Sequence, residues 1–251
     1  MKITAVYFSA TETTKKNVLS IAGALGGDVH EIDVTLPGDL SADFGPDDLV
    51  IFGTPCYGGR VPNLAAQRFE GFKGHNTPAI AVVTYGNRDF DDAIVELADL
   101  ADARGFITVA AAAVIGQHTY GTIAVGRPDA NDLALNADFA KKVKDKLAGG
   151  VSSITASLPG NRPYKDGGKG GAFRPQTTDA CVSCGLCAAQ CPTAAIGDDF
   201  RTIDNDKCIA CFRCIRFCPV KAKVMDTPAY NEFAVGFSQK LAEPKTNRYF
   251  I

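Results

Sequence analysis

The sequence contains no apolar run of the roughly 20 residues that a membrane-spanning helix needs, and MKITAVYF leads into strand-like sequence without the apolar stretch of a signal peptide. It also has little net charge. A formal charge of −2 at pH 7 gives no general attraction to nucleic acid or to an acidic membrane surface. These absences predict a cytoplasmic protein with no nucleic-acid partner and no membrane insertion, and they leave the oligomeric state open.

Two phosphate-binding motifs are also missing. Neither the G-x-x-x-x-G-K-[ST] spacing of a P-loop nor the G-x-G-x-x-G of a dinucleotide fold follows the first apolar run. Hydroxyl residues stand there instead, in the stretch FSATETTKK, at Ser9, Thr11, Thr13 and Thr14. They could bind a phosphate together with the unpaired backbone N–H groups of a helix start. The alternative is an ordinary capped helix, because Ser and Thr are good N-cap residues.

Up to residue 149 the sequence alternates strand-like apolar runs with amphipathic helical patterns. The expected strands are ITAVYF, VHEIDV, DLVIFGTP, PAIAVVTYG and FITVAAAAVIG. Helices are expected around residues 18–25, 63–71, 91–101 and 135–147. Because the strands are almost continuously apolar, they predict a five-stranded parallel sheet with helices on both faces. The predicted fold class is therefore doubly wound α/β.

Polar loops follow the first, third and fourth expected strands. Their sequences are FSATETTKK, GTPCYGGRVP and TYGNRDFDD. Ligands of such sheets bind beyond the carboxyl ends of the strands. We therefore expect these three loops to converge on one edge of the sheet and to form a binding site there.

Eight of the nine cysteines lie between Cys181 and Cys218. Two runs, CVSCGLCAAQCP and CIACFRCIRFCP, share the pattern C-x-x-C-x-x-C-x-x-x-C-P, and the second begins at Cys208, 27 residues after the first (208 − 181). This repeat indicates an internal duplication. Structural zinc sites use well-separated C-x-x-C pairs, whereas three cysteines at three-residue steps indicate an iron–sulfur cluster.

Residues 175–228 resemble bacterial two-cluster ferredoxins, which are small α+β domains. The resemblance implies two [4Fe–4S] clusters whose fourth ligands are exchanged between the runs. One cluster would be held by Cys181, Cys184, Cys187 and Cys218, and the other by Cys208, Cys211, Cys214 and Cys191.

Arg213 and Arg216 depart from the small residues expected beside such a cluster. Their positive charge would favour the reduced, more negative form of the cluster, or the two side chains would form a docking face. The alternative is that both side chains point to solvent.

Residues 1–149 resemble flavodoxins, which hold the phosphate of FMN in a hydroxyl-rich loop and its ring between two later loops. The resemblance implies FMN as cofactor, with Ser9, Thr11, Thr13 and Thr14 at the phosphate. One side of the ring would be formed by Thr54, Pro55, Tyr57, Gly58 and Gly59, and the other by Tyr85, Gly86, Asn87 and Phe90. Tyr57 and Phe90 are the aromatic candidates for stacking on the ring, or else ordinary loop-packing aromatics.

Glu12 stands where the flavodoxin pattern usually has glycine, which tolerates a positive φ and adds no negative charge beside a phosphate. Its side chain is expected either to point outward or to weaken FMN binding. Cys56, the ninth cysteine, either touches the flavin or is a small buried hydrophobe. His30 and His118 are interpreted as structural.

Residues 150–174 are rich in glycine and proline and are interpreted as a linker that packs in part, through PYK or AFRP. Its GGKGG stretch, residues 167–171, neither follows a clear strand nor opens a helix, so it is interpreted as a flexible loop and given no role. Residues 229–251 are expected to form a helical tail.

The YGNR sequence at residues 85–88 is distinctive of flavodoxin-like domains fused to ferredoxins, and the whole chain resembles that flavodoxin–ferredoxin fusion family. The resemblance implies an electron-transfer protein of an anaerobic cell that passes electrons between two [4Fe–4S] clusters and FMN, with redox proteins as partners. The alternative is an FMN-dependent reductase of a quinone or nitro compound, fed by the clusters. In that case Tyr57, Tyr85, Arg60 or Arg88 would be candidate proton donors.

Overall fold

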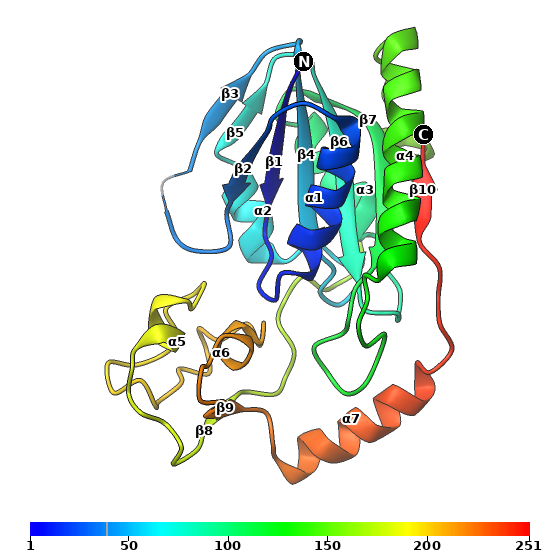
Figure 1. Cartoon of the computed structure of the whole chain (residues 1–251). Coiled ribbons are helices and arrows are strands. Elements are labelled where there is room, and N and C mark those ends of the chain that lie inside the picture. The colour runs from blue at the N-terminus through cyan, green and yellow to red at the C-terminus, as the bar shows by residue number, and fades with distance from the viewer. Residues whose placement is uncertain (39) are drawn as a thin grey trace.

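A computed structural model describes residues 1–38 and 40–251 of the chain. Five parallel strands form a sheet in the order β2, β1, β4, β6, β7, which is the 2-1-3-4-5 order of the flavodoxin-like fold (Figure 1). Their bounds are Lys2–Tyr7 for β1, Val29–Asp33 for β2, Asp48–Pro55 for β4, Thr77–Tyr85 for β6 and Phe106–Ile115 for β7. Each overlaps one of the five apolar runs, so the predicted sheet is confirmed.

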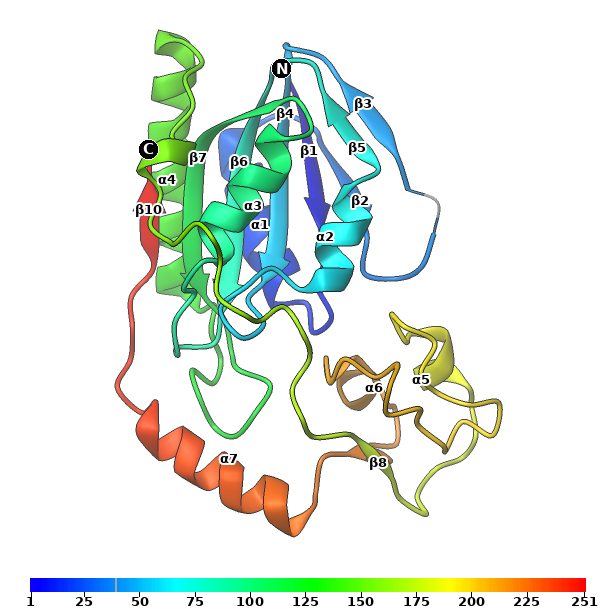
Figure 2. The same ribbon diagram turned by 180° about the vertical axis from the view of Figure 1, so that it is seen from behind.

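Helices cover both faces of this sheet, as Figures 1 and 2 show from opposite sides. One face carries α1 (Thr13–Leu25) and α4 (Ala130–Gly149), and the other carries α2 (Asn63–Phe69) and α3 (Ala93–Asp102). Among the described residues, no helix combines the length and the apolarity that crossing a bilayer requires.

Each face has its own hydrophobic core. Val18 of α1 and Phe139 of α4 are buried in one core. In the other core, the ring of Phe52 in β4 meets those of Phe69 and Phe106 edge-on at centroid distances of 5.4 and 5.0 Å. Because both faces are packed, the polar loops at the carboxyl edge are left as the place for a ligand.

Several small elements were not expected from the sequence. Strands β3 (Ala42–Phe44) and β5 (Phe72–Gly74) pair in parallel outside the main sheet, and a single 3-10 turn, η1, covers Thr155–Ser157. These segments are too short to show a periodic pattern in the sequence.

The cysteine-rich region is the small α+β unit that was expected. Strands β8 (Gln176–Thr177) and β9 (Lys223–Val224) pair antiparallel, and the chain between them forms the short helices α5 (Leu186–Ala189) and α6 (Arg213–Arg216).

The segment that joins the two domains follows the surface of the α/β domain. The Ile154 N–H donates to the Thr108 carbonyl at 2.9 Å. The buried carboxylate of Asp92 accepts from the N–H groups of Asn161 and Lys165 at 2.8 and 2.7 Å. These bonds fix a segment that was interpreted as a linker along much of its length.

The tail returns to the α/β domain. Helix α7 (Pro228–Lys240) begins at a Thr227 cap, whose Oγ1 accepts from the Tyr230 N–H at 3.2 Å. Beyond the helix, β10 (Arg248–Phe250) pairs antiparallel with β7 and becomes the sixth strand of the sheet (Figure 1). The expected helical tail is therefore correct only as far as Lys240, because the residues after the helix bond to the sheet and to its loops.

Candidate functional site

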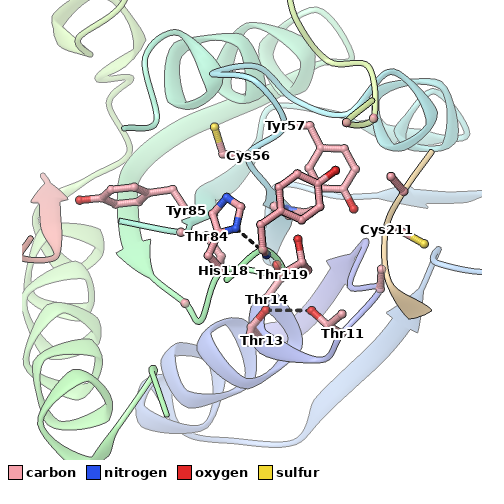
Figure 3. Close-up of a pocket in the computed structure, with 18 of the residues that line it drawn as sticks. Thr11, Thr13, Thr14, Cys56, Tyr57, Thr84, Tyr85, His118, Thr119 and Cys211 are labelled. Carbon is pink, nitrogen blue, oxygen red and sulfur yellow. Dashed lines mark hydrogen bonds between the residues drawn. The ribbon is translucent and has the colours of Figure 1, made fainter. Parts of the chain in front are cut away.

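A cavity of about 280 Å³ lies at the carboxyl ends of β1, β4, β6 and β7 (Figure 3). This is the edge at which the sequence predicts a ligand. The α/β domain lines it with residues 10–11, 13–14, 55–58, 84–86 and 116–120. Residues 169–171 and 209–211 complete the lining, so the cavity lies where the two domains meet.

Three of the four predicted phosphate ligands line this cavity. Thr11, Thr13 and Thr14 reach it from the loop after β1 and from the first turn of α1, and Thr11 Oγ1 lies 3.4 Å from Thr13 Oγ1 (Figure 3). Ser9 is buried outside the lining, where its Oγ accepts a hydrogen bond from the Lys15 N–H at 3.0 Å. Ser9 therefore fixes the loop to α1, and the three threonines are placed to meet a ligand.

Glu12 adopts the left-handed conformation, with φ at 69°, where the flavodoxin pattern usually has glycine. This conformation costs a non-glycine residue about 1–2 kcal/mol. The side chain is exposed and is not part of the lining, which is the outward orientation considered from the sequence. Its carboxylate therefore adds no negative charge to the cavity wall.

The loop after β4 contributes Pro55, Tyr57 and Gly58 to the lining, but not Thr54 or Gly59. Thr54 is fully buried and its Oγ1 donates to the Pro55 carbonyl at 3.2 Å. Gly59 is buried at φ 90° and shapes the turn instead of the wall. Burial raises the pKa of Tyr57 well above its usual value of 10, so the hydroxyl keeps its proton and remains a hydrogen-bond donor.

Cys56 lines the same cavity and belongs to neither cysteine run. Its Sγ lies 3.7 Å from the carbonyl oxygens of Asp89 and Phe90. Burial raises the pKa of this thiol to about 12, so it stays protonated and behaves as a small apolar group.

Only the first half of the predicted loop after β6 lines the cavity. Tyr85 and Gly86 do so, whereas Phe90 is buried in the core behind them. The Phe90 ring meets Tyr85 edge-on at 5.4 Å, and the Arg248 guanidinium of the tail lies 5.3 Å from its centroid. Phe90 is therefore the loop-packing aromatic that the sequence analysis kept as an alternative, and it has no face free for a ligand ring.

Asn87 also lies outside the lining, because its side chain holds the tail. Its Nδ2 donates to the carbonyls of Leu241 and Glu243 at 2.8 and 2.9 Å, and its Oδ1 accepts from the Lys245 N–H at 2.7 Å. All the hydrogen-bonding groups of the amide are thus directed away from the cavity. The residue joins the cavity loop to the C-terminal segment.

Residues 116–120, which follow β7, were not predicted as part of the site. His118, interpreted as structural, lines the cavity, and its Nδ1 accepts from the Tyr120 N–H at 2.8 Å. Burial lowers the pKa of His118 to about 4, so the ring is neutral at pH 7. The signal that could have found this segment is the one used for the other loops, since it also follows a strand.

Tyr120 lines the cavity and has an unsatisfied hydroxyl. Its buried Oη has no hydrogen-bond partner in the part of the chain that the structure describes. Burial raises the pKa of Tyr120 to about 12, so this hydroxyl is also protonated. Because this oxygen has almost no accessible surface, the hydroxyl lies in the aromatic packing behind the wall and is not presented to the cavity.

The GGKGG stretch, which was given no role, forms one wall of the cavity. The Gly168 N–H donates to the Tyr57 carbonyl at 3.0 Å, and the Gly168 carbonyl accepts from the Asn63 N–H at 3.0 Å. Gly170 passes so close to the other domain that an added Cβ would lie 2.0 Å from the Ile209 carbonyl oxygen. The interpretation as a flexible loop is therefore wrong, because the glycines allow a close approach that the sequence does not reveal.

The two predicted cysteine sets each line a small cavity in the cysteine-rich region. Cys191, Cys208, Cys211 and Cys214 line one, and Cys181, Cys184, Cys187 and Cys218 line the other. Within residues 1–38 and 40–251, no three His, Cys, Asp or Glu side chains lie close enough together to share one metal ion. Each set of thiols thus surrounds a small space of its own.

The backbone repeats with the cysteine pattern. Positive φ values occur at Ser183, Gly185 and Ala194, and again 27 residues later at Ala210, Phe212 and Lys221. The Sγ of Cys191 accepts from the N–H four residues further on at 3.3 Å, and that of Cys218 does the same at 3.1 Å. The two runs therefore fold alike, as an internal duplication predicts.

One cysteine set adjoins the large cavity. Cys211 lines both spaces (Figure 3). Burial raises the pKa of the Cys211 and Cys214 thiols to about 12, whereas Cys184 of the other set is exposed. The two sets therefore differ in depth, and only one touches the flavodoxin-like domain's cavity.

Arg213 joins the two domains beside this site. Its guanidinium is buried and donates to the carbonyls of Ala10 and Ser9 at 3.1 and 3.3 Å and to Gln190 Oε1 at 2.5 Å. Arg216 is exposed. Of the two arginines, only Arg216 has the solvent orientation that was considered from the sequence.

Residues 175–219 match the family described as "4Fe-4S dicluster domain". No curated protein has significant sequence similarity to the chain. Among solved structures, a flavodoxin from Streptococcus pneumoniae TIGR4 has 16% identity and a TM-score of 0.43 over 58% of this chain and 99% of its own. Rubredoxin oxygen:oxidoreductase from Desulfovibrio gigas has 15% identity and a TM-score of 0.43 over 59% of this chain, and the match spans only 36% of its length.

The fold assignment rests on the strand order β2, β1, β4, β6, β7, and the assignment of the cysteine-rich region rests on the family match and its repeated runs. Together they show that the chain is a fusion of a flavodoxin-like α/β domain with a 4Fe-4S dicluster domain, a combination suited to electron transfer.

Proposed function

We propose that this protein transfers electrons between two [4Fe–4S] clusters and FMN. The observation that carries the proposal is the position of Cys211. It lines both the large cavity and the enclosed cysteine cavity, which is the one formed by Cys191, Cys208, Cys211 and Cys214. A cluster in the enclosed cysteine cavity would lie directly beside a flavin in the large cavity. When bound, FMN exchanges one or two electrons and each cluster exchanges one, so together they can link two-electron and one-electron carriers.

The large cavity suits FMN in its polarity. Thr11, Thr13 and Thr14 lie at the start of α1, where their hydroxyls and the free N–H groups of the helix would hold the phosphate. Tyr57 keeps its proton at neutral pH and would donate a hydrogen bond to a polar atom of the ring. Acidic side chains are absent from the described lining, which favours an anionic ligand.

The exposed cysteine set supplies the outer end of the route. Cys184 is exposed, so a cluster held by this set would be within reach of a redox protein in solution. We place the protein in the cytoplasm, whose reducing conditions keep ligand thiols free, and in an anaerobic cell, because exposed clusters of this kind are labile to oxygen.

Flavin and iron content test the proposal. Protein purified without oxygen should contain one FMN, with no FAD, and two four-iron clusters per chain. Thr11→Ala combined with Thr14→Ala should weaken FMN binding at least about 100-fold, because two hydrogen bonds to a charged group are lost and each contributes about 1.5–3 kcal/mol. Thr122→Ala, at an exposed position outside the lining, is the matched control. Unchanged flavin affinity in the double variant would contradict the phosphate assignment.

The second candidate function is a reductase of small organic compounds. Measuring which acceptors the reduced protein turns over distinguishes it from an electron carrier. Chemically reduced protein should pass electrons to a protein acceptor such as cytochrome c, and leave quinones and nitro compounds unreduced on the same timescale. Saturable turnover of one of these compounds would favour the reductase instead.

A further inference from the structure

The lining of the large cavity has a single permanently charged side chain among the described residues, that of Lys169. It comes from the middle of the GGKGG stretch, to which the proposed function gives no part. His118 also lines the cavity, but its pKa of about 4 leaves it neutral at pH 7. Among the described residues, the side chain of Lys169 thus provides the one full positive charge in the lining of a cavity that suits an anionic cofactor.

The ammonium group of Lys169 is not used elsewhere in the described structure. The hydrogen bonds and ion pairs of residues 1–38 and 40–251 include none made by its Nζ. By contrast, Lys165, four residues earlier in the same segment, pairs with Asp91 at 2.9 Å. The side chain of Lys169 is exposed and flexible, so its charge is free to meet a ligand in the cavity.

The backbone around Lys169 is fixed on both sides. Gly168 bonds to the Tyr57 carbonyl, and Gly170 lies against Ile209. Neither anchor involves the threonine loop that would hold the phosphate. Lys169 therefore starts from the wall made by the Tyr57 loop and the dicluster domain, which is the side of the cavity assigned to the flavin ring.

We propose that Lys169 is the counter-charge for the negative charge that the FMN ring gains on reduction, and that it raises the potential of the bound flavin. The proposal rests on the proposed function. Two electrons, one from each cluster, together with one proton from solvent leave one negative charge on the ring. A nearby ammonium stabilises that charged form more than the neutral oxidised ring, because opposite charges attract and the neutral ring offers only dipoles.

Redox titration of the FMN in the complete, cluster-loaded protein tests this role. Lys169→Gln should weaken binding of reduced FMN about tenfold more than binding of oxidised FMN, which lowers the two-electron potential by about 30 mV. Lys169→Glu should lower it further, and Lys169→Arg should keep the wild-type value. Lys142→Gln, on the exposed face of α4, removes the same charge at a distance and should change nothing.

Ionic strength provides a second readout. Because Lys169 is exposed, salt should screen its charge, and the difference between wild type and Lys169→Gln should shrink from low to high salt. An unchanged potential in Lys169→Gln would overturn the proposal. Equal loss of affinity for oxidised and reduced FMN would also overturn it, because the charge would then act on the phosphate.

Failure of the proposed function would look different. A wild-type protein that binds no FMN would remove both proposals together. If the wild-type protein binds FMN but substitutions of Lys169 leave the FMN potential unchanged, only the proposed role of Lys169 is wrong.

Discussion

The two cysteine sites share a repeated backbone conformation but differ in how far they are exposed to solvent. The site of Cys208, Cys211 and Cys214 is enclosed between the α/β domain, the GGKGG stretch and helix α7. The site of Cys181 and its partners faces solvent at Cys184, and two exposed apolar side chains line it, those of Val182 and Val220. Duplication thus kept the geometry of the site and changed what covers it.

Two pairs of equivalent positions account for much of this difference. Gly185 of the first run corresponds to Phe212 of the second, and both have a positive φ, 76° and 63°. Phe212 tolerates this conformation because its ring packs against Tyr120 at 5.3 Å and Tyr230 at 6.4 Å. A conformation that glycine adopts freely is here retained by an aromatic residue that joins the dicluster domain to its neighbours.

The second pair is Leu186 and Arg213. Leu186 is exposed at the outer site, whereas Arg213 reaches the carbonyls of the loop after β1. Phe212 and Arg213, two of the positions at which the runs differ, thus contact the flavodoxin-like domain. The comparison teaches that one copy became the inner site through side chains between the cysteines, without any change in the cysteine spacing.

The largest expected effect is the loss of a cluster after mutation of a cysteine in the other cysteine run. Cys191→Ala should abolish the enclosed cluster, although Cys191 belongs to the first run, and Cys218→Ala should abolish the exposed one. Iron analysis with electron paramagnetic resonance of the reduced protein would show which signal remains, and Cys184→Ala would serve to assign the exposed cluster.

Cys56→Ala is the matched control for these variants, because Cys56 lies outside both cysteine cavities and should leave the iron content unchanged. If Cys191→Ala and Cys218→Ala each removed the cluster of their own run, the crossed arrangement would be wrong.

Arg213 and Arg216 offer a sharper comparison within a single helix. Arg213→Gln should destabilise the packing of the two domains by about 2–4 kcal/mol, because it removes charge-assisted hydrogen bonds and leaves buried carbonyls unpaired. Arg216→Gln, one turn away and exposed, should change stability by less than about 0.5 kcal/mol. Urea unfolding followed through the visible absorbance of the clusters measures both, and equal midpoints for the two variants would refute the role of Arg213.

Asn87 tests whether the tail keeps the inner site covered. Asn87→Ala removes three hydrogen bonds to residues 241–245 and should destabilise the docked tail by about 1.5–3 kcal/mol. Hydrogen exchange should then accelerate in β10 and α7, with no change in β2 at the opposite edge of the sheet. Unaltered exchange in the tail would show that β10 pairing alone holds it.

The smallest expected effect is on pH dependence. The pKa of His118 is about 4 in the folded protein, below the usual 6.5 of the unfolded chain, so the unfolded state binds the proton more readily. The stability from the neutral ring is complete above pH 6.5 and is lost as the pH falls toward 4, at no more than about 1.4 kcal/mol per pH unit. His118→Gln should flatten this part of the stability profile, and His30→Gln, at an exposed position, should not. Parallel profiles of stability against pH for wild type and His118→Gln would contradict this contribution of His118.

The features that were predictable from the sequence are those that local pattern determines. Five apolar runs predicted five strands, and their order placed the threonine loop at the ligand edge. The cysteine spacing indicated iron–sulfur sites, and the resemblance to two-cluster ferredoxins implied the two crossed sets, each of which lines one cavity. Regular periodicity and fixed spacing report such features because they involve neighbours along the chain.

The features that were missed depend on contacts between distant residues. Gly170 is constrained by Ile209, and Asn87 is committed to backbone groups more than 150 positions later in the chain. Asn87 was predicted to lie beside the flavin ring because its loop resembles a ring-binding loop of flavodoxins, and nothing local shows that its amide bonds elsewhere. The same holds for β10, which is too short to be predicted without its partner strand β7.

Strand β10 also determines the order in which the molecule can be assembled. As the chain is synthesised, β7 is complete at residue 115, and its outer edge stays unpaired until Arg248–Phe250 leave the ribosome. The whole dicluster domain is made during that interval, tethered at one end only. The edge of the sheet can therefore be completed only after the dicluster domain has been synthesised, and that domain is then held to the α/β domain by the chain on both of its sides.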